Sequence, residues 1–187
     1  IEFLHESSVL EDPTRVIRAS RYSAKLNFHL SNQALRQIQD TINSWPWNWR
    51  IGDNVDLAPS ALSIRLKMEL ELLFKSQYWK NSLKNLQEWG GLKLIDSKLQ
   101  NDEKLNEKIF IAKNSNIEPL TALIYESKNP IYLARRLHLN KQQTEIIEGA
   151  CRLKKYLEEI TASHLYKSWS PSKWTTVLEE INTNESS

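Results

Sequence analysis

The hydrophobic and polar positions of this chain alternate with the period of α-helices almost throughout. In residues 60–75, Leu62, Leu66, Leu70 and Leu73 recur three or four positions apart, which places them on one face of a helix. Similar spacing in other segments predicts an all-α fold of about eight or nine helices. The further predicted helices lie at about 13–26, 32–44, 78–88, 102–114, 118–127, 130–137, 141–162 and 171–182.

Capping residues mark several of the predicted boundaries. Asp12 is a good N-cap, and Pro13 suits the first helical position, where its missing N–H costs nothing. Ser31 or Asn32 caps the next helix. Gly90 provides the left-handed conformation that commonly ends a helix.

Four segments lack a helical pattern. Residues 1–4 and 92–95 look briefly strand-like, and residues 183–187 are expected to fray. Residues 45–59 are predicted to form a loop. Its tryptophans either form an exposed platform or fold back over the core. They are Trp45, Trp47 and Trp49.

Composition excludes several classes of protein. Charged residues make up 26% and hydrophobic residues 40% of the chain, which is typical of a globular protein and excludes a disordered one. The single cysteine, Cys151, excludes an intramolecular disulfide and Cys-rich zinc sites, and we expect it to be buried in a helix. There is no apolar run of about 18 residues and no signal-peptide pattern. We therefore expect a cytoplasmic protein.

Basic residues gather toward the C-terminal end of the chain. The net charge is only +2, but residues 128–174 hold nine basic and four acidic side chains, an excess of five positive charges. Such an excess indicates either a phosphate-binding surface or an ordinary solvated helix face. Trp169 and Trp174 lie in the same region and either stack on nucleotides or belong to the core.

The first predicted long helix carries an unusual polar face. Arg15, Arg18 and Arg21 recur every three residues, Lys25 follows, and Asp12 precedes Arg15 by three. Residues spaced by three or four share a helix face, so a carboxylate is followed by a row of guanidiniums. This arrangement suits a polyphosphate or a nucleic-acid backbone. Alternatively, Asp12 is only a cap and Arg15 is only solvated or salt-bridged.

The motifs of this region resemble those of a known family. The stretch VLEDPTRVIRASRYSAKLNF resembles the EDxxR motif and neck helix of class II template-independent nucleotidyltransferases. This family contains the CCA-adding tRNA nucleotidyltransferases and the bacterial poly(A) polymerases. Further on, SIRLKMELELL resembles a family element with an arginine and a glutamate, here Arg65 and Glu69, and YWKNSLKNLQEWGGLKLID resembles a helix ending in a Gly-Leu turn. The resemblance is strong over residues 1–35 and 60–96.

The resemblance implies a role for each motif residue. Asp12 and Arg15 correspond to the pair that reads the base of the incoming ATP or CTP, and Arg18 to a residue near the sugar or phosphates. Arg65 and Glu69 would brace the neck helix; alternatively, they form an ordinary pair within their own helix. The residues expected to support the motif structurally are Glu11, Arg21, Arg65 and Glu69.

The resemblance also implies a domain organisation. Residues 1–10 would end the catalytic head, residues 11–95 would form the neck, and residues 96–182 would form a body and tail that bind tRNA or another RNA 3′ end. The expected RNA-binding residues of the body are Arg135, Arg136, Lys154, Lys155 and Lys167.

The catalytic motifs of such an enzyme are missing from this sequence. Nucleotidyl transfer of this type uses divalent metal ions held by clustered carboxylates, and the family's DxD motif and Gly-rich turn are both absent. Asp53 and Asp56 are interpreted as loop residues. The histidines lack metal-ligand spacing; they are His5, His29, His138 and His164.

We therefore expect no catalytic residue, metal site or cofactor in this chain, with Mg²⁺ bound in a head outside it. The chain alone is predicted to transfer no nucleotide. A different hypothesis is a non-catalytic helical module that binds RNA or protein. The sequence does not distinguish CCA, CC, A or poly(A) addition, and it leaves the oligomeric state open.

Overall fold

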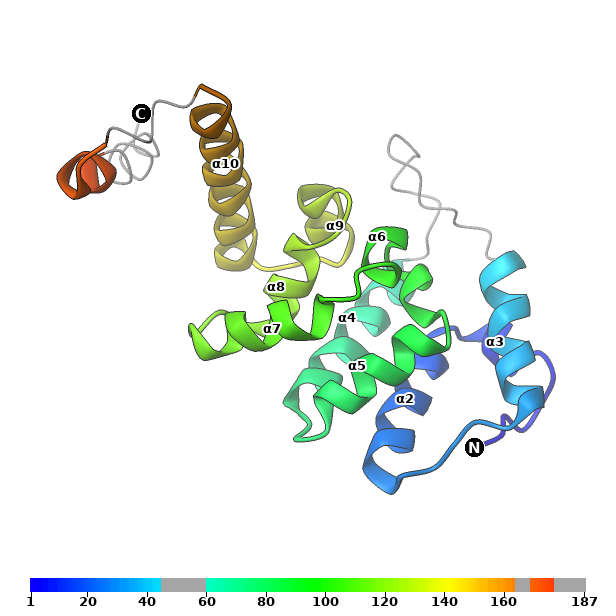
Figure 1. Ribbon diagram of the computed structural model, residues 1–187. Helices are drawn as coiled ribbons and strands as arrows, with labels where there is room; N and C mark the ends of the chain where they lie inside the picture. Colours follow the sequence, from blue (N-terminus) through cyan, green and yellow to red (C-terminus); the bar gives the residue numbers. More distant parts are fainter. Residues whose placement is uncertain (45–59, 164–168, 177–187) are drawn as a thin grey trace.

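The predicted all-α fold is confirmed by a computed structural model, which describes residues 1–44, 60–163 and 169–176. These residues contain no β-strand, and eight of the helices have seven or more residues. Figure 1 shows α10 at one end of the molecule and α3 at the other, with α4 and α5 between them. The elements are α1 (Ser8–Glu11), α2 (Thr14–Leu26), α3 (Asn32–Ser44), α4 (Ser60–Lys75), α5 (Trp79–Glu88), the 3₁₀ helix η2 (Gly91–Leu94), α6 (Ser97–Gln100), α7 (Leu105–Asn114), α8 (Pro119–Tyr125), α9 (Pro130–Arg136), α10 (Lys141–Ser163) and a helix at 171–176.

Helix α2 begins one residue later than the sequence predicts, at Thr14. Pro13 precedes it with helical dihedral angles, and the Asp12 carboxylate still acts as a cap. Its Oδ1 accepts hydrogen bonds from the Thr14 backbone N–H at 3.2 Å and from the Thr14 hydroxyl at 2.6 Å. The cap satisfies an N–H that has no partner within the helix.

Both strand-like predictions are wrong. The 3₁₀ helix η2 begins after Gly90, which has a left-handed conformation. It includes residues 92–94, and Ile95 is its C-cap. A Cβ atom on Gly91 would lie 2.5 Å from Leu86 Cδ1 and 2.9 Å from Val16 Cγ1, so a larger residue here would require these side chains of α5 and α2 to shift. At the N-terminus, the Ile1 ammonium donates to the His29 carbonyl at 2.6 Å, without a strand ladder.

Helix α6 was not predicted, although its capping signal is present in the sequence. Asp96 has an extended backbone, and its Oδ1 accepts from the N–H groups of Lys98 at 2.8 Å and Leu99 at 3.3 Å. The helix has only four residues, so it shows no repeating apolar pattern. Short elements of this kind are held by caps and packing instead of by amphipathic periodicity.

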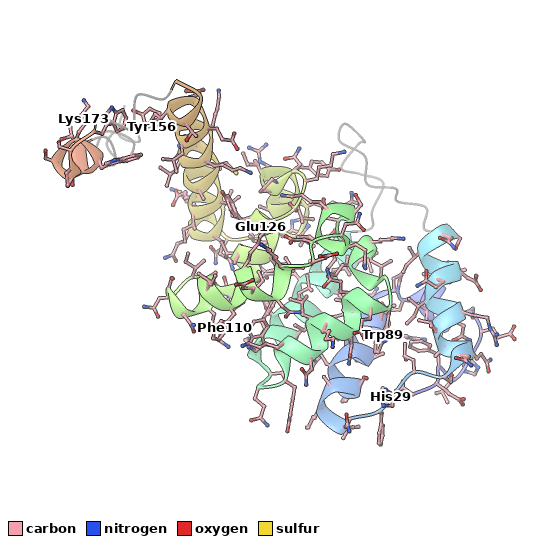
Figure 2. The ribbon with its side chains drawn as sticks, in the orientation of Figure 1. His29, Trp89, Phe110, Glu126, Tyr156 and Lys173 are labelled. Carbon is pink, nitrogen blue, oxygen red and sulfur yellow. The ribbon has the colours of Figure 1, made fainter. Side chains whose placement is uncertain are left out.

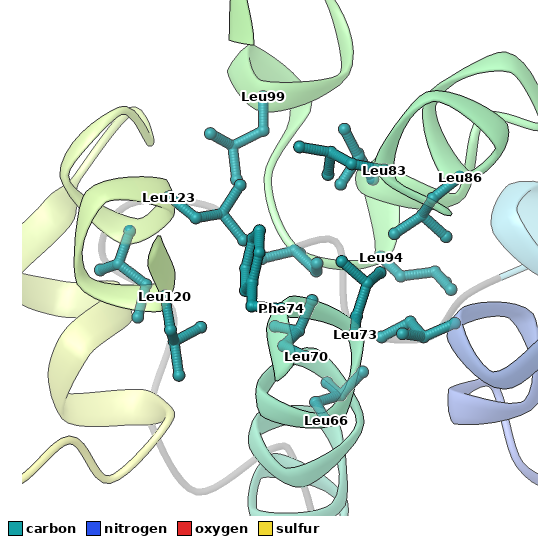
Figure 3. Close-up of a cluster of buried hydrophobic side chains, with 14 of the residues drawn as sticks. Leu66, Leu70, Leu73, Phe74, Leu83, Leu86, Leu94, Leu99, Leu120 and Leu123 are labelled. Carbon is teal, nitrogen blue, oxygen red and sulfur yellow. The ribbon is translucent and has the colours of Figure 1, made fainter. Parts of the chain in front are cut away.

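Helix α4 lies at the centre of the hydrophobic core. Its predicted stripe is confirmed: Leu62 is 6% exposed, and Leu66, Leu70 and Leu73 are fully buried. Figure 3 shows this face surrounded by leucines from α5, η2, α6 and α8. The same cluster of contacts reaches from Val9 in α1 to helix α10. Burying each leucine stabilises the fold by about 1.5–3 kcal/mol.

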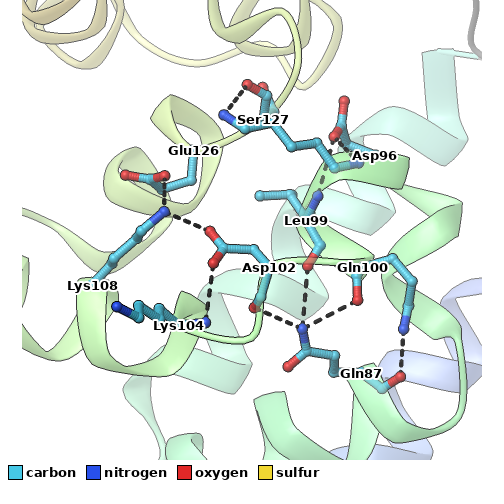
Figure 4. Close-up of polar contacts among 10 residues, drawn as sticks. Gln87, Asp96, Leu99, Gln100, Asp102, Lys104, Lys108, Glu126 and Ser127 are labelled. Carbon is cyan, nitrogen blue, oxygen red and sulfur yellow. Dashed lines mark hydrogen bonds and ion pairs between the residues drawn. The ribbon is translucent and has the colours of Figure 1, made fainter.

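A polar network joins α5 to the helices that follow it (Figure 4). The side-chain amide of Gln87 donates to the carbonyls of Gln100 at 3.2 Å and Asp102 at 2.9 Å, and Gln100 returns a bond to the Gln87 carbonyl at 2.6 Å. Beside it, Lys108 Nζ lies 2.7 Å from Asp102 and 2.8 Å from Glu126. The hydrogen bonds that the ammonium donates to these two carboxylates raise the pKa of Lys108.

Several predictions concern residues outside the described part of the chain. They are the loop at 45–59 with Trp45, Trp47, Trp49, Asp53 and Asp56, the residues His164 and Lys167, and the segment 183–187. Among the described helices, none combines the length and apolar character that crossing a membrane requires.

Two leucines on α4 test the importance of its buried face. We expect Leu70→Ala to lower the free energy of unfolding by about 2–5 kcal/mol, because the side chain is fully buried and its loss leaves a cavity. Leu72→Ala is the matched control, since Leu72 is 41% exposed, and its effect should stay within about 0.5 kcal/mol. Urea unfolding followed by circular dichroism measures both. Equal effects would contradict the central position of α4.

Candidate functional site

Two of the arginines on α2 converge on one buried carboxylate of α4. Glu69 is 6% exposed. Its Oε1 accepts from Arg18 Nε at 3.0 Å and Nη2 at 2.6 Å, and its Oε2 accepts from Arg21 Nη1 at 2.6 Å. The hydrogen bond and the charge of Glu69 raise the pKa of Arg18. One carboxylate therefore fixes the orientation of α2 against α4.

Glu69 and Arg65 both point across to α2, and no contact between the two is observed. Arg65 Nη1 lies 3.5 Å from Asp12 Oδ2, at the start of α2. The alternative of an ordinary pair within α4 is thus wrong. One feature of the sequence indicates that Glu69 needs a charged partner. It lies among the buried leucines of α4, where an unpaired carboxylate would be energetically costly.

Arg15 differs from the other arginines on this face of α2. It is half-buried, and its guanidinium makes no hydrogen bond or ion pair with the described part of the chain. Its backbone N–H donates to the Asp12 carbonyl at 3.0 Å, so the two residues lie on adjacent positions of the same turn. Glu11, which the sequence assigns to motif support, accepts from the Ser7 hydroxyl at 2.5 Å within α1.

Four of the expected RNA-binding residues lie in the described part of the chain, on α9 and α10, and they differ in their exposure to solvent. Arg136 is only 5% exposed, and its Nη1 donates to the Tyr132 hydroxyl at 3.4 Å. A guanidinium buried to this extent is less accessible to an RNA backbone than an exposed one, and RNA binding by Arg136 stays a prediction. Arg135, Lys154 and Lys155 are exposed.

Each of these three exposed cations has a glutamate nearby. Arg135 lies 4.0 Å from Glu148. The lysines form pairs within α10, with Lys154 at 3.9 Å from Glu158 and Lys155 at 3.9 Å from Glu159. The positive charge counted along this stretch is therefore partly neutralised on its own surface.

The remaining candidates show no catalytic arrangement. Trp169 and Trp174 pack edge to face with ring centroids 5.0 Å apart. Cys151 is partly buried in α10, and burial raises the pKa of its thiol. Within residues 1–44, 60–163 and 169–176, no three His, Cys, Asp or Glu side chains come together as a metal site would require.

Comparison with curated proteins identifies a relative with a defined activity. The chain is 27% identical over 110 residues to the A-adding tRNA nucleotidyltransferase of Aquifex aeolicus (strain VF5). The match covers 59% of this chain and 12% of that protein. No protein-family model matches the chain.

Solved structures agree with this match. A tRNA-processing enzyme with CTP superimposes with a TM-score of 0.57 at 19% identity, covering 96% of this chain and 55% of that one. A tRNA nucleotidyltransferase complexed with a primer tRNA and an incoming ATP analogue gives a TM-score of 0.56 at 20% identity, covering 98% and 60%. The chain resembles the tRNA nucleotidyltransferases. It spans little more than half the length of these solved chains.

Two glutamates on α4 test the junction with α2. We expect Glu69→Gln to lower the free energy of unfolding by about 1–3 kcal/mol, because a buried amide accepts weaker hydrogen bonds from the two charged guanidiniums. Glu71→Gln is the matched control: Glu71 is 3.9 Å from Lys67 at a more exposed position, and its loss should cost less than about 0.5 kcal/mol. Thermal and urea unfolding measure the difference. A similar cost for both would contradict the anchoring role of Glu69.

Proposed function

We propose that this chain is the base-selecting and RNA-binding portion of a template-independent tRNA nucleotidyltransferase or poly(A) polymerase that adds CMP or AMP to RNA 3′ ends. The observation that carries the proposal is that some polar side chains at the start of α2 and along it are held by Glu69, whereas others are not. Arg18 and Arg21 are held by Glu69, whereas the Arg15 guanidinium and the Asp12 Oδ2, both near the start of α2, keep hydrogen-bonding capacity. Likeness to the solved structures with CTP and with tRNA plus an ATP analogue supports it.

One carboxylate oxygen of Asp12 can accept a hydrogen bond from an incoming base. Its Oδ1 is occupied by the two bonds from Thr14. Its Oδ2 has only the 3.5 Å contact with Arg65, which is long for a hydrogen bond. A carboxylate oxygen accepts more than one bond, so Oδ2 can accept from an amino group while Oδ1 keeps the side chain oriented.

Arg15 supplies the complementary donor. Its guanidinium is uncommitted to the described part of the chain, and it remains charged at any physiological pH. Asp12 lies just before α2 and Arg15 lies in its first turn, where the Arg15 backbone N–H donates to the Asp12 carbonyl at 3.0 Å. A planar ligand edge can therefore meet a donor and an acceptor together.

This pair matches the edges of adenine and cytosine. Each of these bases has an exocyclic amino group next to an unprotonated ring nitrogen. The Asp12 carboxylate would accept from the amino group while the Arg15 guanidinium donates to the ring nitrogen. Guanine and uracil present a carbonyl next to a ring N–H, and this reversed polarity would leave all four groups unsatisfied.

Arg18 is placed to contact the sugar or the phosphates. Its side chain is 52% exposed although it bonds Glu69. The bonds to Glu69 use Nε and Nη2, so Nη1 remains available to a phosphate oxygen. Arg21 is 22% exposed and is a structural support in this proposal.

Among the described residues, no three His, Cys, Asp or Glu side chains come together as a ligating cluster. In this proposal the metal ions and the DxD carboxylates belong to a catalytic head of the full-length protein. The metal ions would stabilise the charge of the transferring phosphoryl group. Helix α2 would contribute base selection and binding.

Base selection predicts a specific defect for Arg15→Ala in the full-length protein. We expect the preference for ATP over GTP to fall about 5- to 150-fold, which corresponds to about 1–3 kcal/mol for one well-placed base contact. The ratio of kcat/KM values for ATP and GTP measures the preference.

The matched control is Lys25→Ala, which removes an exposed cation from the same helix almost three turns beyond Arg15. Its nucleotide preference should be unchanged. An Arg15→Ala protein that keeps its preference would show that Asp12 and Arg15 are structural only.

The chain of 187 residues is expected to transfer no nucleotide by itself. The reason is that metal-dependent transfer needs clustered carboxylates, which the described residues lack. Incubation with Mg²⁺, labelled ATP or CTP and a tRNA transcript, followed by gel electrophoresis, measures the product. Metal-dependent addition of CMP or AMP at the rate of the full-length protein would refute the proposal that the catalytic carboxylates lie in a separate head domain.

A further inference from the structure

Lysines and exposed aromatic rings gather where the turn between α4 and α5 lies against α7. Tyr78 is 36% exposed and Phe110 is 41% exposed. Lys80 Nζ lies 3.5 Å from the centre of the Phe110 ring, on the neighbouring helix. Figure 2 labels Phe110 on α7. We call this surface the lysine–aromatic cluster, and its members are Lys75, Tyr78, Lys80, Phe110 and Lys113.

Buried Trp79 forms the base of the lysine–aromatic cluster. It is 5% exposed and packs against Phe74 with ring centroids 6.0 Å apart. Lys80 and Lys113 approach its ring, with Nζ at 5.8 Å and 5.6 Å from the ring centre. These cation–π contacts hold two ammonium groups over a fixed aromatic base.

The three lysines of the cluster carry unneutralised charge. Lys75, Lys80 and Lys113 are exposed and form no ion pair within the described part of the chain. The lysines of α10 differ in this respect: those that form pairs with a glutamate four residues later are Lys141, Lys154 and Lys155. The cluster is therefore a stronger source of positive potential, residue for residue, than the basic stretch at 128–174.

We propose that the lysine–aromatic cluster binds RNA, with its lysines on backbone phosphates and Tyr78 or Phe110 stacked on an unpaired base. The inference rests on the proposed function for its RNA substrate, and it assigns the contact to the α4–α5–α7 surface. Uncompensated lysines supply the salt-sensitive attraction to phosphates. Exposed aromatic rings supply stacking that tolerates any base.

The chemistry favours RNA over a protein partner. Lysine is depleted from protein–protein interfaces, where its charge and flexible side chain are costly to bury. Phosphates accept ammonium groups without removing them from water. Two partly exposed rings set among three lysines thus fit a nucleotide strand better than the apolar face of a protein.

Binding of a fluorescein-labelled tRNA transcript that ends before the terminal adenosine tests the proposal by fluorescence anisotropy. The 187-residue chain is compared with a variant carrying Lys75→Gln, Lys80→Gln and Lys113→Gln. We expect Kd to rise about tenfold or more at low salt, and the slope of log Kd against log salt to fall by about two.

The matched control carries Lys67→Gln, Lys84→Gln and Lys141→Gln, which removes the same number of charges from lysines that are each paired with a glutamate four residues later. Its Kd should change less than about threefold, because charges that are already compensated release fewer counterions. Arginine at the three cluster positions should preserve binding, and circular dichroism establishes that each variant is folded.

The stacking contact is tested separately by Phe110→Leu, which keeps an apolar side chain and removes the ring. We expect Kd to rise about fivefold with little change in the salt slope. Equal weakening by the two triple variants, or none by the cluster variant, would overturn the assignment and leave the Arg15 test of base selection standing. No tRNA binding by the unchanged chain would refute both the cluster and the RNA-binding part of the proposed function.

Discussion

The buried carboxylate of Glu69 is the constraint on which the arrangement of the candidate site depends. A charge at this depth must be paired and hydrogen-bonded, because an unpaired carboxylate inside a protein costs several kcal/mol. Arg18 and Arg21 meet that requirement together. They can do so only if α2 lies against α4 in one register, and this register also sets the direction of Asp12 and Arg15. The salt bridges of Arg18 and Arg21 therefore position Asp12 and Arg15, which are the residues that can still form hydrogen bonds with a ligand.

Packing makes the same register rigid. Val16 and Ile17 of α2 are fully buried, and Gly91 allows the chain after α5 to pass close to Val16. The leucine face of α4 belongs to the same core and reaches α8. Gln87 and Gln100 then join α5 to the segment that begins α7. The lysine–aromatic cluster beside α7 and the candidate base-binding residues near α2 are consequently supported by the same continuous hydrophobic core.

The sequence predicted the features that follow from periodicity and capping. The stripe on α4, the start of α3 and the glycine after α5 all depend on near neighbours in the chain, so local pattern is sufficient. It failed for residues 92–95, where three apolar residues suggest a strand but close packing against α2 and α5 requires a 3₁₀ turn. Spacing alone did not identify the partners of Arg65 and Glu69, although the family resemblance implied that both residues brace the neck helix. Spacing gives the residues that share a helix face, but only tertiary packing gives the helix that the face meets.

The sequence also does not show which charged side chains are paired after folding. Counting along the sequence gave an excess of positive charge in residues 128–174, yet regular spacing on α10 places a glutamate four residues after several of its lysines, and Arg136 is buried. Around the turn between α4 and α5, Lys75 and Lys80 lie close to aromatic residues in the sequence. Glu71 precedes Lys75 by four residues, yet neither lysine forms an ion pair within the described part of the chain. The field that a phosphate meets depends on charges left unpaired after folding, since paired charges largely cancel at distances beyond a few ångströms. A short segment with unpaired lysines can thus attract RNA more strongly than a longer segment with a larger formal charge.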